Sequence, residues 1–259
     1  MPRYYPKKPT QVETMYELET SKNKYLLTTR ESESSVMIYI GGIDTYCLEC
    51  QIIKENAVAN LPKIIYDEKC SLTGKFERGT DTLMLMTLLV NYVKEKYTYV
   101  SAITFDDYST RECTPAVHIE LAPFYFVFHE KTWYMDRMDA YVFDPVEKDD
   151  FITKTNKFQE AKKETSWEQY DSMVTTKHPL PESEMRALYD SSETWLEFFN
   201  ALKSAMKKDM HALCLYMYPW ITSFVQTVAK LKFTSIQFAI PVNKFVNLTR
   251  IKIWKRKNH

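Results

Sequence analysis

The most regular hydrophobic pattern in the chain lies between residues 79 and 107. Apolar side chains recur there at helical spacing, which indicates a helix with one broad buried face. The side chains of Thr80 and Asp81 can accept hydrogen bonds from the free N–H groups of its first turn. The next segment, residues 100–105, is short, β-branched and apolar, as is typical of a buried strand. We therefore predict a long helix packed on the strand that follows it.

Shorter patterns flank this pair on both sides. Several short apolar runs come before the helix, and Gly41-Gly42 separates two of them as a hairpin turn would, which predicts an antiparallel meander. After the pair, a polar loop is expected over 106–115. The aromatic run at 123–138 fits a buried helix better than a strand. The strands predicted from these patterns cover residues 24–29, 36–40, 46–53, 61–67, 116–121 and 141–143.

The composition shifts after Asp144. Residues 147–172 are charged and only weakly amphipathic. Two helices are then predicted from 3.6-residue periodicity, one at 183–206 with a break near 190–192, and one at 210–231 interrupted at Pro219. The last stretch alternates between polar and apolar residues, which predicts one or two strands between 233 and 254.

Together these patterns predict an α+β fold. A mixed, mostly antiparallel sheet with packed helices is followed by a helical C-terminal region. The expected organisation is an N-terminal arm at 1–20, an α/β core at 21–145, and a mostly helical region with a basic tail at 146–259.

Composition narrows the class of protein. Apolar residues make up 45% of the 259 residues, which excludes a disordered chain. The chain has only four glycines, so few places allow the backbone to approach a phosphate closely. No segment reaches the roughly 18 apolar residues of a membrane span, and the N-terminus lacks the apolar stretch of a secretory signal.

The five cysteines are odd in number and scattered, which does not suggest a disulfide framework. We expect small buried hydrophobic residues in a reducing, intracellular compartment. Cys47 and Cys50 have zinc-like spacing, but a structural zinc site needs a second close pair, so no metal site is predicted. In a strand, these two thiols would also point to opposite faces.

The charge is unevenly distributed along the chain. Residues 210–259 contain eight basic residues and no acidic one, although the whole chain has a net charge of zero. The tail surrounds an aromatic residue with positive charges, a composition suited to an acidic protein surface or to nucleic acid, although it would also serve solubility alone. The candidate partner-binding residues are Lys252, Trp254, Lys255, Arg256 and Lys257.

The order of the elements resembles the GCN5-related N-acetyltransferase fold: a meander, a loop, a long helix, a strand, and a second helix that carries a tyrosine. In that family the loop before the long helix reads Q/R-x-x-G-x-G/A, and its backbone N–H groups hold the pyrophosphate of coenzyme A. The corresponding segment here is Arg78-Gly79-Thr80-Asp81-Thr82, which keeps one glycine and places a carboxylate where the pyrophosphate would lie.

This resemblance supplies the candidate catalytic and cofactor residues. If acetyl-CoA binds, Arg78, Gly79 and Thr80 would contact it, and Tyr134 would be the general acid toward the departing thiolate. The alternative is that Tyr134 packs in the core beside Trp133.

A second resemblance rests on the phrase FHEKTWYMDRM at 128–138. It is similar to a Lys-Thr-Trp-Tyr-Glu phrase in uncharacterised proteins of nucleocytoplasmic large DNA viruses, with Met135 in place of the Glu. The likeness covers about residues 75–143 and implies a viral origin and a degenerate acetyltransferase-like core. A further hypothesis places His129 near Asp106 and Asp107 in an acid–base cluster, with a solvated helix end as the ordinary alternative.

The expected function is therefore that of a non-enzymatic viral structural or interaction protein, a minor component of a capsid or virion, without a cofactor. Its partners would be other viral proteins in the assembly, and it would be found in the virion or the host cytoplasm. The first alternative is an acetyl-CoA-dependent N-acetyltransferase. The second is a nucleic-acid-binding protein that uses its basic tail.

Overall fold

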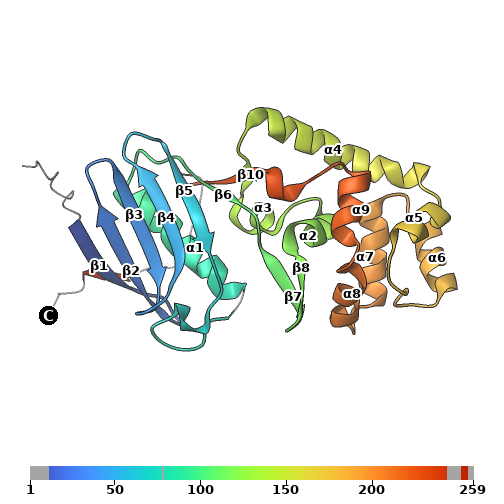
Figure 1. The fold of residues 1–259 in the computed structure, drawn as a ribbon, viewed down its shortest axis with the longest axis horizontal. Coiled ribbons are helices and arrows are strands. Elements are labelled where there is room, and N and C mark those ends of the chain that lie inside the picture. The colour runs from blue at the N-terminus through green and yellow to red at the C-terminus, as the bar shows by residue number, and fades with distance from the viewer. Residues whose placement is uncertain (1–11, 78, 244–251, 256–259) are drawn as a thin grey trace, which may run out of the picture. The chain divides into compact units, whose positions relative to one another are not determined.

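The chain divides into two compact units. Unit 1 comprises Met1–Phe105 and Ala239–His259, and unit 2 comprises Asp106–Phe238. The computed structural model describes residues 12–77, 79–243 and 252–255 (Figure 1). Strands and helices are both abundant, and the largest sheet is mixed but mostly antiparallel, which confirms the predicted α+β class.

Unit 1 begins with an antiparallel meander. Each strand pairs with the next one along the chain, and β1 is also paired with the short strand β11 near the C-terminus. Residues 12–19 of the expected N-terminal arm therefore form a strand, while residues 1–11 lie outside the described residues. These strands are β1 (Val12–Glu19), β2 (Lys24–Glu31), β3 (Ser35–Gly41), β4 (Tyr46–Ile53), β5 (Val58–Ile64) and β11 (Lys252–Lys255).

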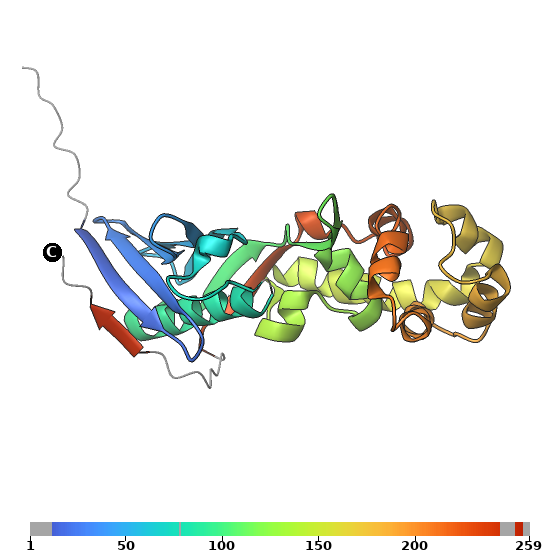
Figure 2. The same ribbon diagram turned by 90° about the horizontal axis from the view of Figure 1, so that it is seen from below.

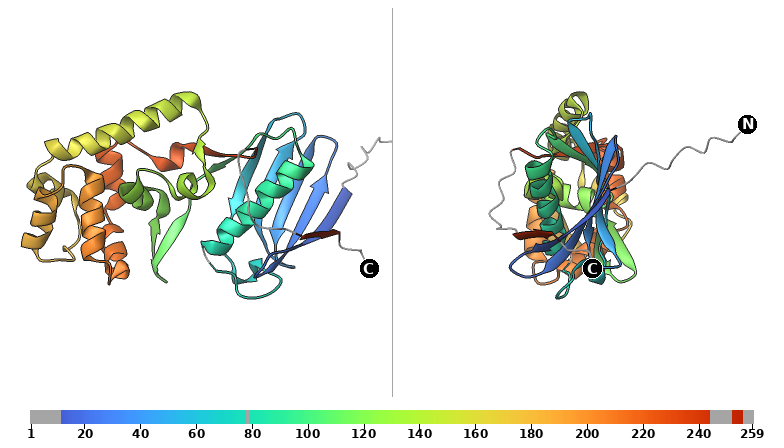
Figure 3. Two further views of the ribbon diagram at one scale, coloured as in Figure 1. Left: turned by 180° about the vertical axis from the view of Figure 1, so that it is seen from behind. Right: turned by 90° about the vertical axis from the view of Figure 1, so that its left-hand side faces the viewer.

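The predicted helix–strand pair is present in unit 1. Helix α1 (Thr80–Lys96) connects β5 to β6 (Ala102–Asp106), and these two strands are parallel. Figure 3 shows α1 lying along one face of the meander, where its apolar side chains are buried. The sheet order is β11-β1-β2-β3-β4-β5-β6-β10-β9, so β10 (Gln237–Pro241) lies between β6 and β9 (Tyr141–Val142).

Unit 2 begins with a hairpin that the sequence did not predict. Residues 106–115 were expected to be a loop, but β7 (Thr110–Thr114) pairs with β8 (Val117–Glu120). The polar pattern of β7 misled the prediction, because only Cys113 among its five side chains is buried on this two-stranded ribbon. The aromatic run is helical as predicted, in two pieces, α2 (Leu121–His129) and α3 (Trp133–Met138).

The rest of unit 2 is helical. The predicted breaks are confirmed, since one helix ends at Asp190 and its successor starts after the Thr194 capping box, and Pro219 lies between the next two helices. A short 3-10 helix, η2 (Phe233–Ser235), precedes β10. The helices are α4 (Pro145–Glu164), α5 (Trp167–Met173), α6 (Glu182–Asp190), α7 (Trp195–Ala205), α8 (Met210–Met217) and α9 (Ile221–Val228).

Aromatic rings fill the core of unit 2. The helices around α7, coloured yellow to orange in Figure 2, enclose a network of rings in which Trp195 and Phe224 meet edge to face with centroids 4.9 Å apart. Tyr170 contacts six other aromatic rings, and its hydroxyl group lies 2.9 Å from that of Tyr216. Edge-to-face contacts of this kind add to the stabilisation that ring burial already provides.

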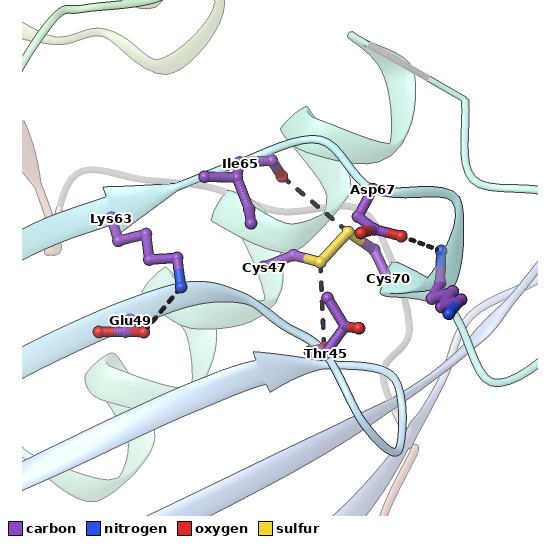
Figure 4. The surroundings of a disulfide bond; sticks show 8 residues. Thr45, Cys47, Glu49, Lys63, Ile65, Asp67 and Cys70 are labelled. Atoms are coloured by element: carbon purple, nitrogen blue, oxygen red, sulfur yellow. Dashed lines mark hydrogen bonds and ion pairs between the residues drawn. A yellow bond between two sulfur atoms is a disulfide. The ribbon is translucent and has the colours of Figure 1, made fainter.

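Four of the five cysteines form disulfides, which corrects the expectation that they are buried thiols. Cys47 bonds to Cys70 in unit 1 (Figure 4). Cys113 bonds to Cys214 in unit 2. Cys50 is buried and free, and burial raises the pKa of its thiol to about 12. The two bonds favour an oxidising setting over the reducing compartment that the cysteine count suggested.

None of the helices in the described part of the chain is both long and apolar enough to cross a bilayer.

Candidate functional site

The candidate cofactor loop precedes helix α1 in unit 1. Gly79 occupies the N-cap position with φ of 85°, a conformation that residues with a side chain rarely adopt. Thr80 is the first helical residue and is exposed. Arg78, the third candidate, lies outside the described residues. The start of α1 therefore depends on the backbone freedom of one glycine.

The side chain of Asp81 is buried at the start of this helix. Its side chain is 4% exposed, and its Oδ2 accepts a hydrogen bond from the backbone N–H of Glu77. In return, the N–H of Asp81 donates to the carbonyl oxygen of Glu77 at 2.9 Å. The expected capping of the helix by Thr80 or Asp81 is wrong, because the N-cap is Gly79 and no described side chain caps the first turn. The Asp81 carboxylate instead binds the backbone of the loop that precedes the helix. A carboxylate thus lies at the helix start to which the acetyltransferase resemblance assigned the coenzyme phosphate.

Tyr134, the candidate general acid, lies in unit 2. It follows the N-cap of α3, where Thr132 accepts a hydrogen bond from the N–H of Met135. The ring is buried and packs edge to face on Trp133, with centroids 5.0 Å apart. Burial, and to a lesser extent the negative charge of Asp107, raise the pKa of its hydroxyl. Tyr134 is therefore packed in the core beside Trp133, and its role as a general acid stays a prediction.

Asp107 lines a cavity of about 230 Å³ within unit 2. The cavity lies where the β7–β8 hairpin meets the first turn of α2 and the short helix η2, elements that Figure 1 shows near one another. The carbonyl oxygen of Ser109 accepts a hydrogen bond of 2.9 Å from the N–H of Leu121, which fixes the loop to the start of α2. The lining residues are Asp107, Tyr108, Ser109, Thr110, Glu120, Ala122, Pro123, Phe233 and Thr234.

The two oxygens of the Asp107 carboxylate have different surroundings. Oδ1 accepts hydrogen bonds from the backbone N–H of Ser109 at 3.0 Å and from the Ser109 hydroxyl. Oδ2 is buried and has no hydrogen-bond partner among the described residues. Burial raises the pKa of this carboxyl, and the two bonds from Ser109 oppose the rise only in part. Among the described residues, Oδ2 of this carboxylate therefore lacks a hydrogen-bond donor.

The residues around His129 differ from those of the hypothetical acid–base cluster. His129 stacks on Tyr125 with centroids 4.1 Å apart, and the Tyr125 hydroxyl donates to Asp136 at 2.7 Å. Burial and the positive charge of Lys203 lower the pKa of the imidazole. Its carboxylate neighbour is Asp136 rather than Asp107, because the turn of α2 and α3 brings the two helices together.

The basic tail is only partly described. Lys252, Trp254 and Lys255 belong to β11, which pairs antiparallel with β1, while Arg256 and Lys257 lie outside the described residues. The prediction that these residues bind a partner or nucleic acid stays a prediction.

Sequence reasoning selected Asp107 but not the residues that surround it. Ser109 and Glu120 come from the two ends of one hairpin, whereas Phe233 comes from a 3-10 helix more than 100 residues further along the chain. The run Asp106-Asp107 after a buried strand was the available signal, and nothing in the local pattern near Phe233 pointed to the same place.

Comparisons with known protein families, with curated proteins and with solved structures found no match.

Proposed function

We propose that this chain is a non-enzymatic interaction protein with an acetyltransferase-like core, encoded by a large DNA virus and incorporated as a minor component of its capsid or virion. The observation that carries the proposal is the start of α1, where the buried Asp81 carboxylate bonds to the backbone of the preceding loop. A coenzyme pyrophosphate needs free N–H groups and positive potential at such a helix start.

Binding a pyrophosphate there would place two anionic groups against each other in a desolvated position. Like charges at close range in a medium of low dielectric constant repel strongly, and no described basic side chain forms an ion pair with Asp81. The geometry therefore favours a scaffold that has kept the helix and strands but uses another surface for its function.

The contact surface that we assign to a neighbouring viral protein surrounds the Cys47–Cys70 disulfide. Ile43, Ile65 and Tyr66 are exposed on two segments that meet there. The backbone of Gly42 packs so closely on Lys69 that an added Cβ would lie 2.0 Å from its carbonyl oxygen.

Backbone bonds hold both segments, since the N–H of Ile65 donates to the carbonyl oxygen of Cys47 at 2.8 Å. In Figure 4, Ile65 and Asp67 lie on the segment that returns to the disulfide. Exposed apolar side chains on such a constrained support lose little conformational entropy when a partner covers them.

Incorporation into particles tests the proposal. The tagged full chain is expressed during infection, and particles are purified on a density gradient. Wild type should band with the particles, and the pair Ile43→Asp and Tyr66→Asp should reduce its amount there at least about tenfold, because charges would be buried at the contact. Val146→Asp, at a residue of unit 2 that is 78% exposed, is the matched control and should leave incorporation unchanged. Absence of the wild-type chain from particles would contradict the proposal.

Strand order favours one alternative, an acetyl-CoA-dependent N-acetyltransferase. The parallel strands β5 and β6 are connected through α1, and β10 lies between β6 and β9, which is compatible with the element order of that family. A ligand of the folded state at about 100 times its Kd stabilises by about 2.7 kcal/mol. Acetyl-CoA should then raise the melting temperature of the wild type. A rise only in Asp81→Asn would show that the carboxylate blocks the site, and no rise in either variant would remove the alternative.

A further inference from the structure

The cavity beside Asp107 in unit 2 plays no part in the proposed function. Its walls carry two carboxylates, Asp107 and Glu120, and several hydroxyl groups, and no lysine or arginine is among the residues that line it. Ala122, Pro123 and Phe233 supply a buried apolar wall. The cavity thus combines negative charge with an apolar surface, a combination that suits a cation with a hydrocarbon body.

The Asp107 carboxylate is built into its position. Its side chain is 4% exposed, and Ser109 holds Oδ1 with two hydrogen bonds. Because those bonds fix the plane of the carboxylate, Oδ2 is also fixed, and it has no donor among the described residues. A buried carboxylate oxygen without a donor costs free energy that a ligand with an N–H group would recover.

The size of the cavity limits the ligand. An apolar cavity of about 150 Å³ accepts benzene, so the 230 Å³ here has room for a ring or a short chain with one polar head. An anion is disfavoured because both charged groups that line the cavity are carboxylates. A divalent metal ion is disfavoured because no group of three or more histidine, cysteine, aspartate or glutamate side chains forms a metal site in the described part of the chain.

We propose that this cavity binds a small primary ammonium compound with an apolar body. Its N–H groups donate to Asp107, and its hydrocarbon part contacts Ala122, Pro123 and Phe233. Glu120, which is exposed and pairs with Thr110 where the hairpin joins α2, attracts the cation at the entrance. Thr234 lines the same space, and its hydroxyl group is available to a further polar atom of the ligand.

Titration of the full-length protein with benzylamine tests the proposal. Benzylamine is protonated at neutral pH and fits the volume, whereas benzyl alcohol has the same ring and nearly the same size without the charge. Two-dimensional NMR follows the backbone amides, and the expected shifts lie at Ser109, Thr110 and Thr234. Benzylamine should bind at least about tenfold more tightly than benzyl alcohol, since hydrogen bonds to charged groups are the stronger kind.

Three variants separate the ammonium site from ordinary association with a negative surface. Asp107→Asn keeps an acceptor for Ser109 and should remove the preference for benzylamine. Asp106→Asn, the exposed neighbour, is the matched control and should leave both affinities unchanged. Glu120→Gln should lower the affinity for benzylamine only about two- to threefold, because an exposed charge is screened by solvent.

A third measurement keeps the test decisive if Asp107→Asn folds poorly. In Thr234→Leu the cavity is smaller while both carboxylates remain, and benzylamine should bind several-fold more weakly. The proposal is wrong if benzylamine shows no binding up to about 10 mM, which corresponds to a binding free energy weaker than about 3 kcal/mol. It is equally wrong if benzyl alcohol binds as tightly as benzylamine, or if the shifts lie away from the cavity.

Discussion

The hydrophobic cores of the two units are built from different kinds of side chain. Unit 1 packs branched and straight aliphatic residues of a sheet against one helix, whereas unit 2 packs aromatic rings between helices, most of which are short. Among the twelve largest fully buried side chains of the described residues, nine belong to unit 2, and the other three, Leu18, Tyr25 and Phe76, belong to unit 1.

The number of buried positions that each helix offers accounts for the difference. A helix of seven residues such as α5 offers only two buried positions, Trp167 and Tyr170, so each must cover a large area. Aromatic side chains bury about 150–250 Å² each and pack at many angles. The helix α1 has 17 residues and nine buried positions, and there small and medium side chains are sufficient. The short helices of unit 2 therefore depend on rings, whereas α1 on its sheet does not. The 20-residue helix α4 has only three buried residues, and two of them, Phe151 and Phe158, also belong to the aromatic core.

The disulfides are the strongest test of this contrast. Cys113 and Cys214 are 101 residues apart, and Cys47 and Cys70 are 23 apart. By the entropy of the closed loop, removing the first bond costs about 4.7 kcal/mol and removing the second about 3.4 kcal/mol. Paired Cys→Ala variants, followed by denaturant unfolding with and without reductant, should show the larger loss in unit 2. Equal losses would mean that loop length does not govern their contribution.

Truncation of single core residues tests the packing itself. Phe224→Ala in unit 2 should lower the free energy of unfolding by about 4 kcal/mol, and Leu89→Ala in unit 1 by about 3 kcal/mol, because the larger side chain leaves the larger cavity. Hydrogen exchange followed by mass spectrometry assigns each loss to its unit. A double-mutant cycle between Trp195 and Phe224 should give a coupling of about 0.5–1.5 kcal/mol. A coupling near zero would show that these rings contribute through burial alone.

The start of α1 should be sensitive to one methyl group. Gly79→Ala is expected to lower the stability of unit 1 by about 1–2 kcal/mol, although the new Cβ would meet no atom within 4 Å, because the φ of 85° strains any residue with a side chain. Thermal unfolding measures the loss. Thr80→Ala, at an exposed neighbour, is the control and should change stability by only a few tenths of a kcal/mol. An equal loss of stability in both variants would show that helix propensity, and not the strained φ angle, causes the effect.

The smallest effect concerns pH. The pKa of Asp107 is raised in the folded protein above its ordinary value near 3.8, so folding is favoured when the group is protonated and that advantage is lost as the pH rises through the folded pKa. Asp107→Asn removes this penalty. It should therefore be more stable than wild type at neutral pH, and the gap should close below about pH 4. A gap that is independent of pH would show that the burial of the charge is not its cause.

Local periodicity was enough to locate most elements of both units. The spacing of apolar residues placed α1 and the strands β2 to β5, and Pro219 and the Asp190–Ser192 segment located the breaks between later helices. These features depend on neighbours within a few residues, which is the range that a sequence pattern records. The strand β7 was not predicted, because it has only one buried side chain and therefore no alternation of apolar and polar residues.

Contacts between distant residues were decided only by the tertiary structure. Nothing near Cys113 indicated Cys214, and nothing near Asp107 indicated Phe233, because such pairs form when separate elements pack together. The sequence alone determined the α+β class, the long helix and the unusual carboxylate at its start. Folding decided that Asp81 would be buried, that four cysteines would pair, and that Asp107 would line a cavity with one oxygen lacking a donor among the described residues.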